Sequence, residues 1–219
     1  MEGTSSSSIV RELHRLHNEL SERIEERLSL FRGVWERGDD RELFIELAFC
    51  ILTPQSGARR CADALDCLIK TGALFKGSIE QISCMIHTVR FKNHKASYLI
   101  KARDTFLNGR MSLYRFLKEC GDSESMRERL VRTVKGIGLK EASHYLRNIG
   151  RGDRLAILDR HVLRNMVRLG LIDHAPTCMT PYRYRLLEEK LRAFSDHSGI
   201  PMSHLDFLFL YRGTGDIFK

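Results

Sequence analysis

The chain has 219 residues, 42% of them hydrophobic and 29% charged, with a formal net charge of +8 at pH 7. No apolar run approaches the roughly 18 residues of a membrane-spanning helix, and the six cysteines form no C-x-x-C pair. Their spacing fits neither a zinc site nor an iron–sulfur cluster, so we expect free thiols, no metal site and a cytoplasmic location. The first eight residues are typical of a polar tail and not of an apolar signal peptide.

Helical periodicity dominates the first part of the sequence. Apolar residues recur at helical spacing over residues 9–31, and residues 43–52 (LFIELAFCIL) are apolar on nearly every side, which predicts a central buried helix. A Thr-Pro-Gln-Ser turn ends that helix because proline forces the preceding residue out of helical geometry. We expect Ser56 to cap a following helix. Gln55 then stands in a tight turn, where its side chain either faces water or is presented to a ligand.

Four shorter helices follow, and one basic loop interrupts them. The helices are expected at residues 78–87, 94–107, 112–119 and 123–134. The loop at residues 90–94 (RFKNH) places an aromatic ring among basic and polar groups. Phe91 can belong either to the core or to a stacking surface, and the pattern leaves both open.

Residues 130–159 carry the pattern around which the chain is organised. They read as a helix, a Gly-x-Gly hairpin at Gly136 and Gly138, a second helix ending near Gly150, and the start of a third helix. Glycine permits the positive φ angles and the close backbone approach that a hairpin needs. Backbone N–H groups at the hairpin form an anion site that suits a DNA phosphate. Residues 127–168 hold eleven Lys/Arg against four Asp/Glu, which favours a polyanionic partner over a merely solvated helix face.

Two residues in this segment suggest chemistry. Lys140 opens the second helix, and Asp159 follows 19 positions later at the start of the third. A partly desolvated lysine at a helix start can attack a sugar carbon as a neutral amine. An aspartate nearby can accept a proton or offset the positive charge that grows on a deoxyribose as its base departs. Spacing alone also allows a solvated lysine and an ordinary N-cap aspartate.

The remaining sequence predicts three helices and a short tail. The helices are expected at residues 159–169, 180–195 and 203–211, and the chain ends on Lys219. No segment shows the alternation of a strand, so the predicted fold is all-α.

At the hairpin the sequence resembles a known family. KGIGLKEASHYLRN followed by AILDRHVLR is similar to the helix-hairpin-helix base-excision DNA glycosylases, and most closely to the archaeal-type branch of 8-oxoguanine DNA glycosylase/AP lyases. Weaker similarity covers most of the chain, from ELAFCILTPQS to the final lysine. The resemblance implies that Lys140 forms a Schiff base with the sugar and that Asp159 assists. The implied activity is excision of oxidised guanine followed by strand cleavage through β-elimination.

The resemblance also implies roles in DNA and base recognition. The implied DNA-binding residues are Gln55, which enters the duplex near the flipped nucleotide, with Lys135, Gly136, Gly138, Arg160 and His161. The implied base-recognition residues are Phe91, Asp206, Leu210 and Lys219, whose terminal carboxylate can accept the N7–H that distinguishes 8-oxoguanine from guanine. Leu139 and Leu210 depart from the branch, which usually has tryptophan at both positions. The second of those tryptophans normally stacks on the flipped base.

The implied organisation is two helical domains with the active site in the cleft between them. Residues 1–37 and 152–219 are expected to form one domain, and residues 38–151 a barrel-like domain that carries the hairpin. The implied partner is double-stranded DNA with a damaged base turned out into the cleft, bound by a monomer that is nucleoid-associated if the source is prokaryotic. No membrane is involved and no cofactor is expected, although a monovalent cation can sit at the hairpin backbone.

Two alternatives stay open at this stage. The lesion can be another modified base, such as an oxidised pyrimidine, because Leu210 replaces the stacking tryptophan. A non-catalytic helix-hairpin-helix DNA-binding module would use the hairpin and the basic segment, but would have no need for Lys140 and Asp159 at this spacing.

Overall fold

The computed structural model of the chain describes residues 6–109 and 111–217. Twelve helices and no strands occur in these ranges, so the predicted all-α fold is confirmed. The helices are α1 (Ser6–Arg37), α2 (Asp40–Leu52), α3 (Ala58–Lys70), α4 (Ala73–Lys76), α5 (Ile79–Met85), α6 (Lys92–Phe106), α7 (Leu113–Lys118), α8 (Ser123–Thr133), α9 (Leu139–Asn148), α10 (Arg160–Arg168), α11 (Pro181–Ser198) and α12 (Met202–Thr214). No helix in the described ranges has the length and apolarity that a membrane crossing requires.

Several predicted helix limits are wrong in detail. Helix α1 begins at Ser6, inside the stretch predicted to be a tail. Helix α4 was not predicted, and α3 is capped by the backbone of Gly57 instead of by Ser56. The Ser56 hydroxyl is engaged elsewhere, because it accepts a hydrogen bond from the backbone N–H of Arg90 at 3.1 Å.

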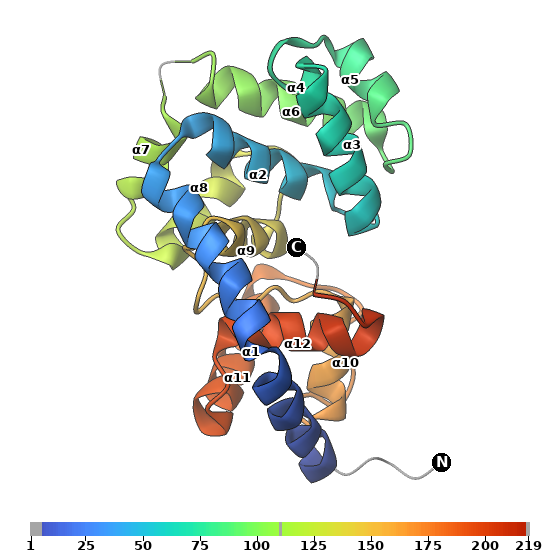
Figure 1. Ribbon diagram of the computed structural model, residues 1–219, viewed down its shortest axis with the longest axis vertical. Coiled ribbons are helices and arrows are strands. Elements are labelled where there is room, and N and C mark those ends of the chain that lie inside the picture. Colours follow the sequence, from blue (N-terminus) through green and yellow to red (C-terminus); the bar gives the residue numbers. More distant parts are fainter. Residues whose placement is uncertain (1–5, 110, 218–219) are drawn as a thin grey trace.

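Two hydrophobic cores organise the helices. The first is built by residues of α2 to α9 up to Leu155, and the second by α1, α10, α11 and α12 from Ala156 onward. Helix α1 runs through both lobes in Figure 1: its residues from Ile9 to Phe31 belong to the second core, whereas Val34 and Trp35 pack against the first. The long N-terminal helix therefore connects the two cores covalently and by packing.

Helix α2 is the centre of the first core, as its sequence predicts. Nine of its thirteen residues are buried, which is why it is apolar on nearly every side. Its start is fixed by Asp39, whose carboxylate accepts hydrogen bonds from the backbone N–H groups of Arg41 and Glu42. Its end is fixed by the turn that contains Gln55, so the position of that turn depends on a buried helix.

The two glycines of the hairpin between α8 and α9 have different backbone conformations: Gly136 has a positive φ, and Gly138 is extended. Gly136 has φ +92°, and a Cβ atom at this position would overlap the ring of Tyr98 on α6. Gly138 has φ −111° and ψ −168°, so the predicted positive φ is wrong there. Gly138 instead serves as the N-cap of α9, with its N–H donated to Glu141 Oε2 at 3.2 Å. The prediction for Gly136 is confirmed.

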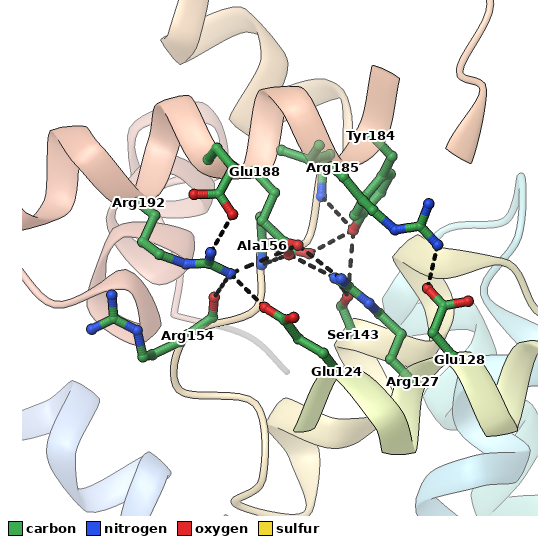
Figure 2. Close-up of polar contacts among 12 residues, drawn as sticks. Glu124, Arg127, Glu128, Ser143, Arg154, Ala156, Tyr184, Arg185, Glu188 and Arg192 are labelled. Carbon is green, nitrogen blue, oxygen red and sulfur yellow. Dashed lines mark hydrogen bonds and ion pairs between the residues drawn. The ribbon is translucent and has the colours of Figure 1, made fainter. Parts of the chain in front are cut away.

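Two buried ion pairs connect the cores. Arg127 of α8 forms a bidentate pair with Glu188 of α11, with N–O distances of 2.6 and 2.8 Å (Figure 2). Arg147 of α9 lies 3.6 Å from Asp206 of α12, nitrogen to oxygen. Each pair joins a helix of the first core to a helix of the second, so the relation of the two cores depends on buried charge as well as on apolar packing.

The hairpin geometry predicts different costs for two glycine substitutions. Gly121 also has a positive φ (+80°), but a Cβ there meets no atom within 4 Å. We expect Gly121→Ala to lower the free energy of unfolding by about 1 kcal/mol, the cost of a left-handed alanine. Gly136→Ala carries that strain plus the overlap with Tyr98, and we expect a total loss of about 2–4 kcal/mol. Urea unfolding of both variants measures the difference, and equal losses would contradict the role assigned to Tyr98.

Candidate active site

Lys140 lies at the start of α9, directly after the hairpin. Its side chain is 29% exposed, and its Nζ lies 3.0 Å from Glu141 Oε1. The other carboxylate oxygen of Glu141 accepts the N–H of Gly138, so one glutamate contacts both the hairpin backbone and the lysine. The preceding residue, Leu139, packs against the second core although the rest of α9 lies in the first. Lys140 is therefore placed where the two cores meet.

Asp159 is the N-cap of α10, as its sequence position suggests. Its Oδ1 accepts hydrogen bonds from the backbone N–H groups of His161 (2.8 Å) and Val162 (2.9 Å). No residue in the described ranges forms a hydrogen bond to Oδ2, and the side chain is half-buried. One oxygen is thus fixed by the helix and the other is available to a ligand.

Asp206 of α12 links these two residues electrostatically. Burial raises the pKa of Asp206 to about 6; the guanidinium of Arg147 opposes the rise, the charge of Asp159 adds to it, and that of Lys140 opposes it. The charges of Lys140 and Asp159 therefore act on the same carboxyl group. Lys140 and Asp159 both lie within electrostatic range of Asp206, and the catalytic role that the resemblance implies for them stays a prediction.

Arg147 is the buried counter-charge of this group, and sequence analysis missed it. Its guanidinium is 5% exposed and lies between two aromatic rings, 4.5 Å from the centre of Phe207 and 5.2 Å from that of Phe31. Burial lowers the pKa of Arg147, and the negative charge of Asp206 counteracts that effect. The sequence around Arg147 shows only a helix with an apolar face. It does not reveal that Arg147 pairs with Asp206 on a helix far along the chain.

The turn of Gln55 and the loop of Phe91 are neighbours, because the Ser56 hydroxyl accepts the backbone N–H of Arg90. Among the described residues these are the only two non-glycine positions with positive φ, at +54° and +59°. Both side chains are exposed, and Phe91 at 52% cannot be a core residue. The core alternative for Phe91 is therefore excluded, and both residues are presented to solvent from strained backbone.

Lys95 of α6 holds the Gln55 turn. Its buried Nζ donates to the carbonyls of Leu52 (2.6 Å) and Pro54 (2.7 Å) and to the hydroxyl of Ser56 (3.1 Å). Burial lowers the pKa of Lys95, and Lys140 is among the positive charges that act in the same direction. The charge of Lys140, the candidate nucleophile, therefore acts on the lysine that holds the Gln55 turn.

The other predicted DNA-binding residues differ in exposure. Lys135 and Gly136 are exposed at the hairpin, and Arg160 is exposed at the start of α10. His161 is half-buried, with its ring so close to Gly213 of α12 that a Cβ there would overlap it. Positively charged side chains are thus exposed at the hairpin and at the start of α10.

The C-terminal segment returns toward the first core. Asp216 forms an ion pair with Arg59 of α3, and Ile217 packs against the second core. Leu210, at the position usually taken by tryptophan, is half-buried on α12. Lys219, predicted to read the base, lies outside the described residues. The last described residues therefore lie beside α3, whose N-terminal end follows the Gln55 turn.

A profile of the 8-oxoguanine DNA glycosylase family matches residues 24–200. The 8-oxoguanine DNA glycosylase/AP lyase of Fusobacterium nucleatum is 40% identical over 209 residues, which cover 95% of this chain and 96% of that protein. The protein of the same name from Methanocaldococcus jannaschii is 32% identical over 218 residues, covering 96% and 99%.

Solved structures agree with these relatives in fold. The crystal structure of the 8-oxoguanine DNA glycosylase of Thermotoga maritima matches with a TM-score of 0.88 at 34% identity, covering 98% of this chain and 100% of that one. The 8-oxoguanine glycosylase/lyase of Methanocaldococcus jannaschii, in complex with 15mer DNA containing 8-oxoguanine, matches with a TM-score of 0.87 at 29% identity. That match covers 96% of this chain and 99% of the other.

The raised pKa of Asp206 predicts a pH dependence of stability. The carboxyl titrates near 6 when folded and at 3.8 when unfolded, so the folded state binds its proton more tightly. Stability due to this group therefore rises as the pH falls from 7.5 to 5, by about 1.4 kcal/mol. We expect the free energy of unfolding of the wild type to gain that amount relative to Asp206→Asn over this range. Other titrating groups, such as His17, are common to both proteins and cancel, so a constant difference would contradict the burial of this carboxyl.

Proposed function

The chain belongs to the 8-oxoguanine DNA glycosylase family, and we propose on that premise that it excises 8-oxoguanine from double-stranded DNA and then cleaves the strand as an AP lyase. The observation that supports the proposal is the arrangement where the two cores meet: Lys140 opens α9 directly after the hairpin, and Asp159 caps α10 with one carboxylate oxygen that has no hydrogen-bond partner among the described residues. The relatives named 8-oxoguanine DNA glycosylase/AP lyase support both activities.

The proposed mechanism uses side chains of this chain alone. Lys140 loses a proton and its Nζ attacks C1′ of the damaged nucleotide, while the bond between C1′ and N9 breaks and the base leaves with the electron pair. Asp159 faces the positive charge that develops on the sugar and can accept a proton from the lysine. The sugar ring opens to an imine with Lys140. Transfer of a proton from C2′ to the departed base, which left as an anion, then expels the 3′ phosphate with the electrons of the C3′–O bond and breaks the strand.

Support for the DNA-binding assignments comes from exposure and backbone geometry. Gly136 has no side chain to block the approach of a phosphate to the hairpin N–H groups, and the exposed Lys135 adds a positive charge. At the start of α10 the exposed Arg160 adds another positive charge, and its Nε lies 3.3 Å from Nε2 of His161. Gln55 is exposed on strained backbone in a turn held by Lys95, a position suited to filling the space of a flipped nucleotide.

The proposal extends to recognition of the damaged base. We propose that Phe91, Asp206 and Leu210 surround the base, with Lys219 as the further recognition residue. The ion pair of Asp216 with Arg59 supports a C-terminal segment held against the first core. A leucine offers less stacking area than the usual tryptophan, so Leu210 makes another modified base the second candidate substrate.

Borohydride trapping tests the nucleophile. A duplex containing 8-oxoguanine should give a stable protein–DNA adduct with the wild type, because reduction fixes the imine. Lys140→Gln should abolish the adduct and base excision while the dissociation constant for DNA changes little. Lys76→Gln, which removes another lysine, exposed at the end of α4, is the control and should trap at full yield. An adduct formed at full yield by Lys140→Gln would assign the nucleophile to another residue.

Substitution of Asp159 tests the role of its charge. Asp159→Asn keeps the shape and most of the N-cap capacity, so we expect a small change in stability and a fall of at least about 100-fold in excision rate. Asp122 is a matched control because it caps α8 through a hydrogen bond from Ser125 N–H at 2.8 Å. Asp122→Asn should lose similar stability and retain the wild-type rate. Near-normal excision by Asp159→Asn would leave the aspartate a helix cap only.

A further inference from the structure

A buried polar cluster lies between α11 and the segment that leads to Asp159. Its members are drawn in Figure 2, and they come from α8, α9, α11 and residues 154–158. Tyr184, Glu188, Arg127 and Ser143 are each 2% exposed or less. Polar side chains this deeply buried are stable mainly where they form hydrogen bonds or ion pairs with one another.

Glu188 contacts both sides of the junction. Its two carboxylate oxygens accept hydrogen bonds from Arg127 of α8, and Oε1 also accepts the backbone N–H of Ala156 at 2.7 Å. Burial acts to lower the pKa of Arg127, but the hydrogen bonds and the charge of Glu188 raise it overall, so the guanidinium stays charged. The glutamate thus fixes the start of the segment before Asp159 to the first helix of the hairpin motif.

Tyr184 contacts the same segment at two further points. Its hydroxyl donates to the carbonyl of Ala156 at 2.5 Å and accepts the N–H of Leu158 at 3.4 Å. It also lies 3.4 Å from the hydroxyl of Ser143. Burial raises the pKa of Tyr184, so the hydroxyl keeps its proton and remains a donor throughout the neutral range.

The cluster is connected to the two proposed catalytic residues through helix α9 and through the backbone of residues 156–159. Ser143 stands three positions after Lys140 on α9, so it shares a rigid helix with the lysine. On the other side, the N–H of Asp159 donates to the carbonyl of Ile157 at 2.7 Å. Ile157 lies between residues 156 and 158, the two whose backbone Tyr184 contacts. One tyrosine therefore contacts the helix of the nucleophile and the backbone that precedes the carboxylate.

We propose that Tyr184 and Glu188 are positioning residues, which set the place of Asp159 relative to Lys140 without contacting the substrate. This inference rests on the proposed function and adds to it the residues that hold the reacting groups in register. A misplacement of about 1 Å can cost roughly 100-fold in rate. A hydrogen-bonded backbone between two cores is suited to prevent such a displacement.

The test compares two buried tyrosines. Tyr184→Phe removes the hydroxyl that holds residues 156 and 158. Tyr145→Phe removes an equally buried hydroxyl from α9, and that hydroxyl has no hydrogen-bond partner among the described residues. We expect Tyr184→Phe to lower the single-turnover excision rate at saturating enzyme by about 10-fold to 100-fold, with the dissociation constant for lesion DNA unchanged. Tyr145→Phe should retain the wild-type rate.

A double-mutant cycle separates positioning from general damage to the fold. If Tyr184 acts through Asp159, its loss costs little once the carboxylate charge is gone. Tyr184→Phe combined with Asp159→Asn should then be no more than about twofold slower than Asp159→Asn alone. Rates are measured well below the melting temperature of each variant, with the active fraction counted by active-site titration.

The outcomes distinguish this inference from the proposed function. An active wild type with an unimpaired Tyr184→Phe variant, or with losses that multiply in the double variant, would overturn the positioning role alone. A wild type that neither excises 8-oxoguanine nor cleaves an abasic site would overturn the proposed function and the positioning role with it. If Tyr184→Phe fails to fold, Ser143→Ala replaces it. That variant removes the contact of Tyr184 with α9 together with a hydrogen bond from Arg127 to Ser143 at 3.2 Å. It leaves the contacts of Tyr184 with residues 156 and 158 intact, so it should show a smaller loss of rate with the same lack of additivity.

Discussion

The bidentate ion pair between Arg127 and Glu188 is the interaction on which the rest of the structure depends. Both side chains are almost fully buried, so neither charge can be solvated if its partner is lost. Such a pair contributes little net stability compared with apolar packing, but it permits one arrangement of the two cores and penalises others. Glu188 Oε1 also accepts the N–H of Ala156, and this hydrogen bond extends the constraint to the chain that crosses between the cores.

The charged residues of the proposed catalytic group also differ in whether they have a partner of opposite charge. Lys140 has Glu141 beside it and Asp206 has Arg147, whereas Asp159 uses one oxygen for the helix cap and leaves the other without a partner among the described residues. The carboxylate least committed to a cation is therefore the one assigned to the charge that develops on the sugar. Asp206, with its raised pKa, is poorly suited to that task because it loses its charge near pH 6.

Sequence patterns predicted the helices and the catalytic pair but not the contacts between helices. Periodicity reports which face of a helix is apolar, so α2 and α9 could be predicted from it. The pair Lys140 and Asp159 was suggested by the resemblance to a family, because spacing alone also allowed a solvated lysine and an ordinary helix cap. Arg127 and Glu188 are 61 positions apart on helices whose charged residues resemble solvated faces. The assignment of Ser56 as a helix cap failed for a related reason, because a side chain from α6 competes for its hydroxyl.

The two strained residues fit the same physical account. A left-handed backbone at a non-glycine residue costs about 1–3 kcal/mol, and it persists only where surrounding contacts determine it. At Gln55 the buried ammonium of Lys95 supplies three hydrogen bonds, each worth about 1.5–3 kcal/mol for a charged donor, so the contacts outweigh the strain. A relaxed turn would cost less, so a strained conformation at an exposed residue is expected where the side chain must meet a partner in a fixed position. The strain at Gln55 and Phe91 is therefore independent support for a DNA surface that includes both residues.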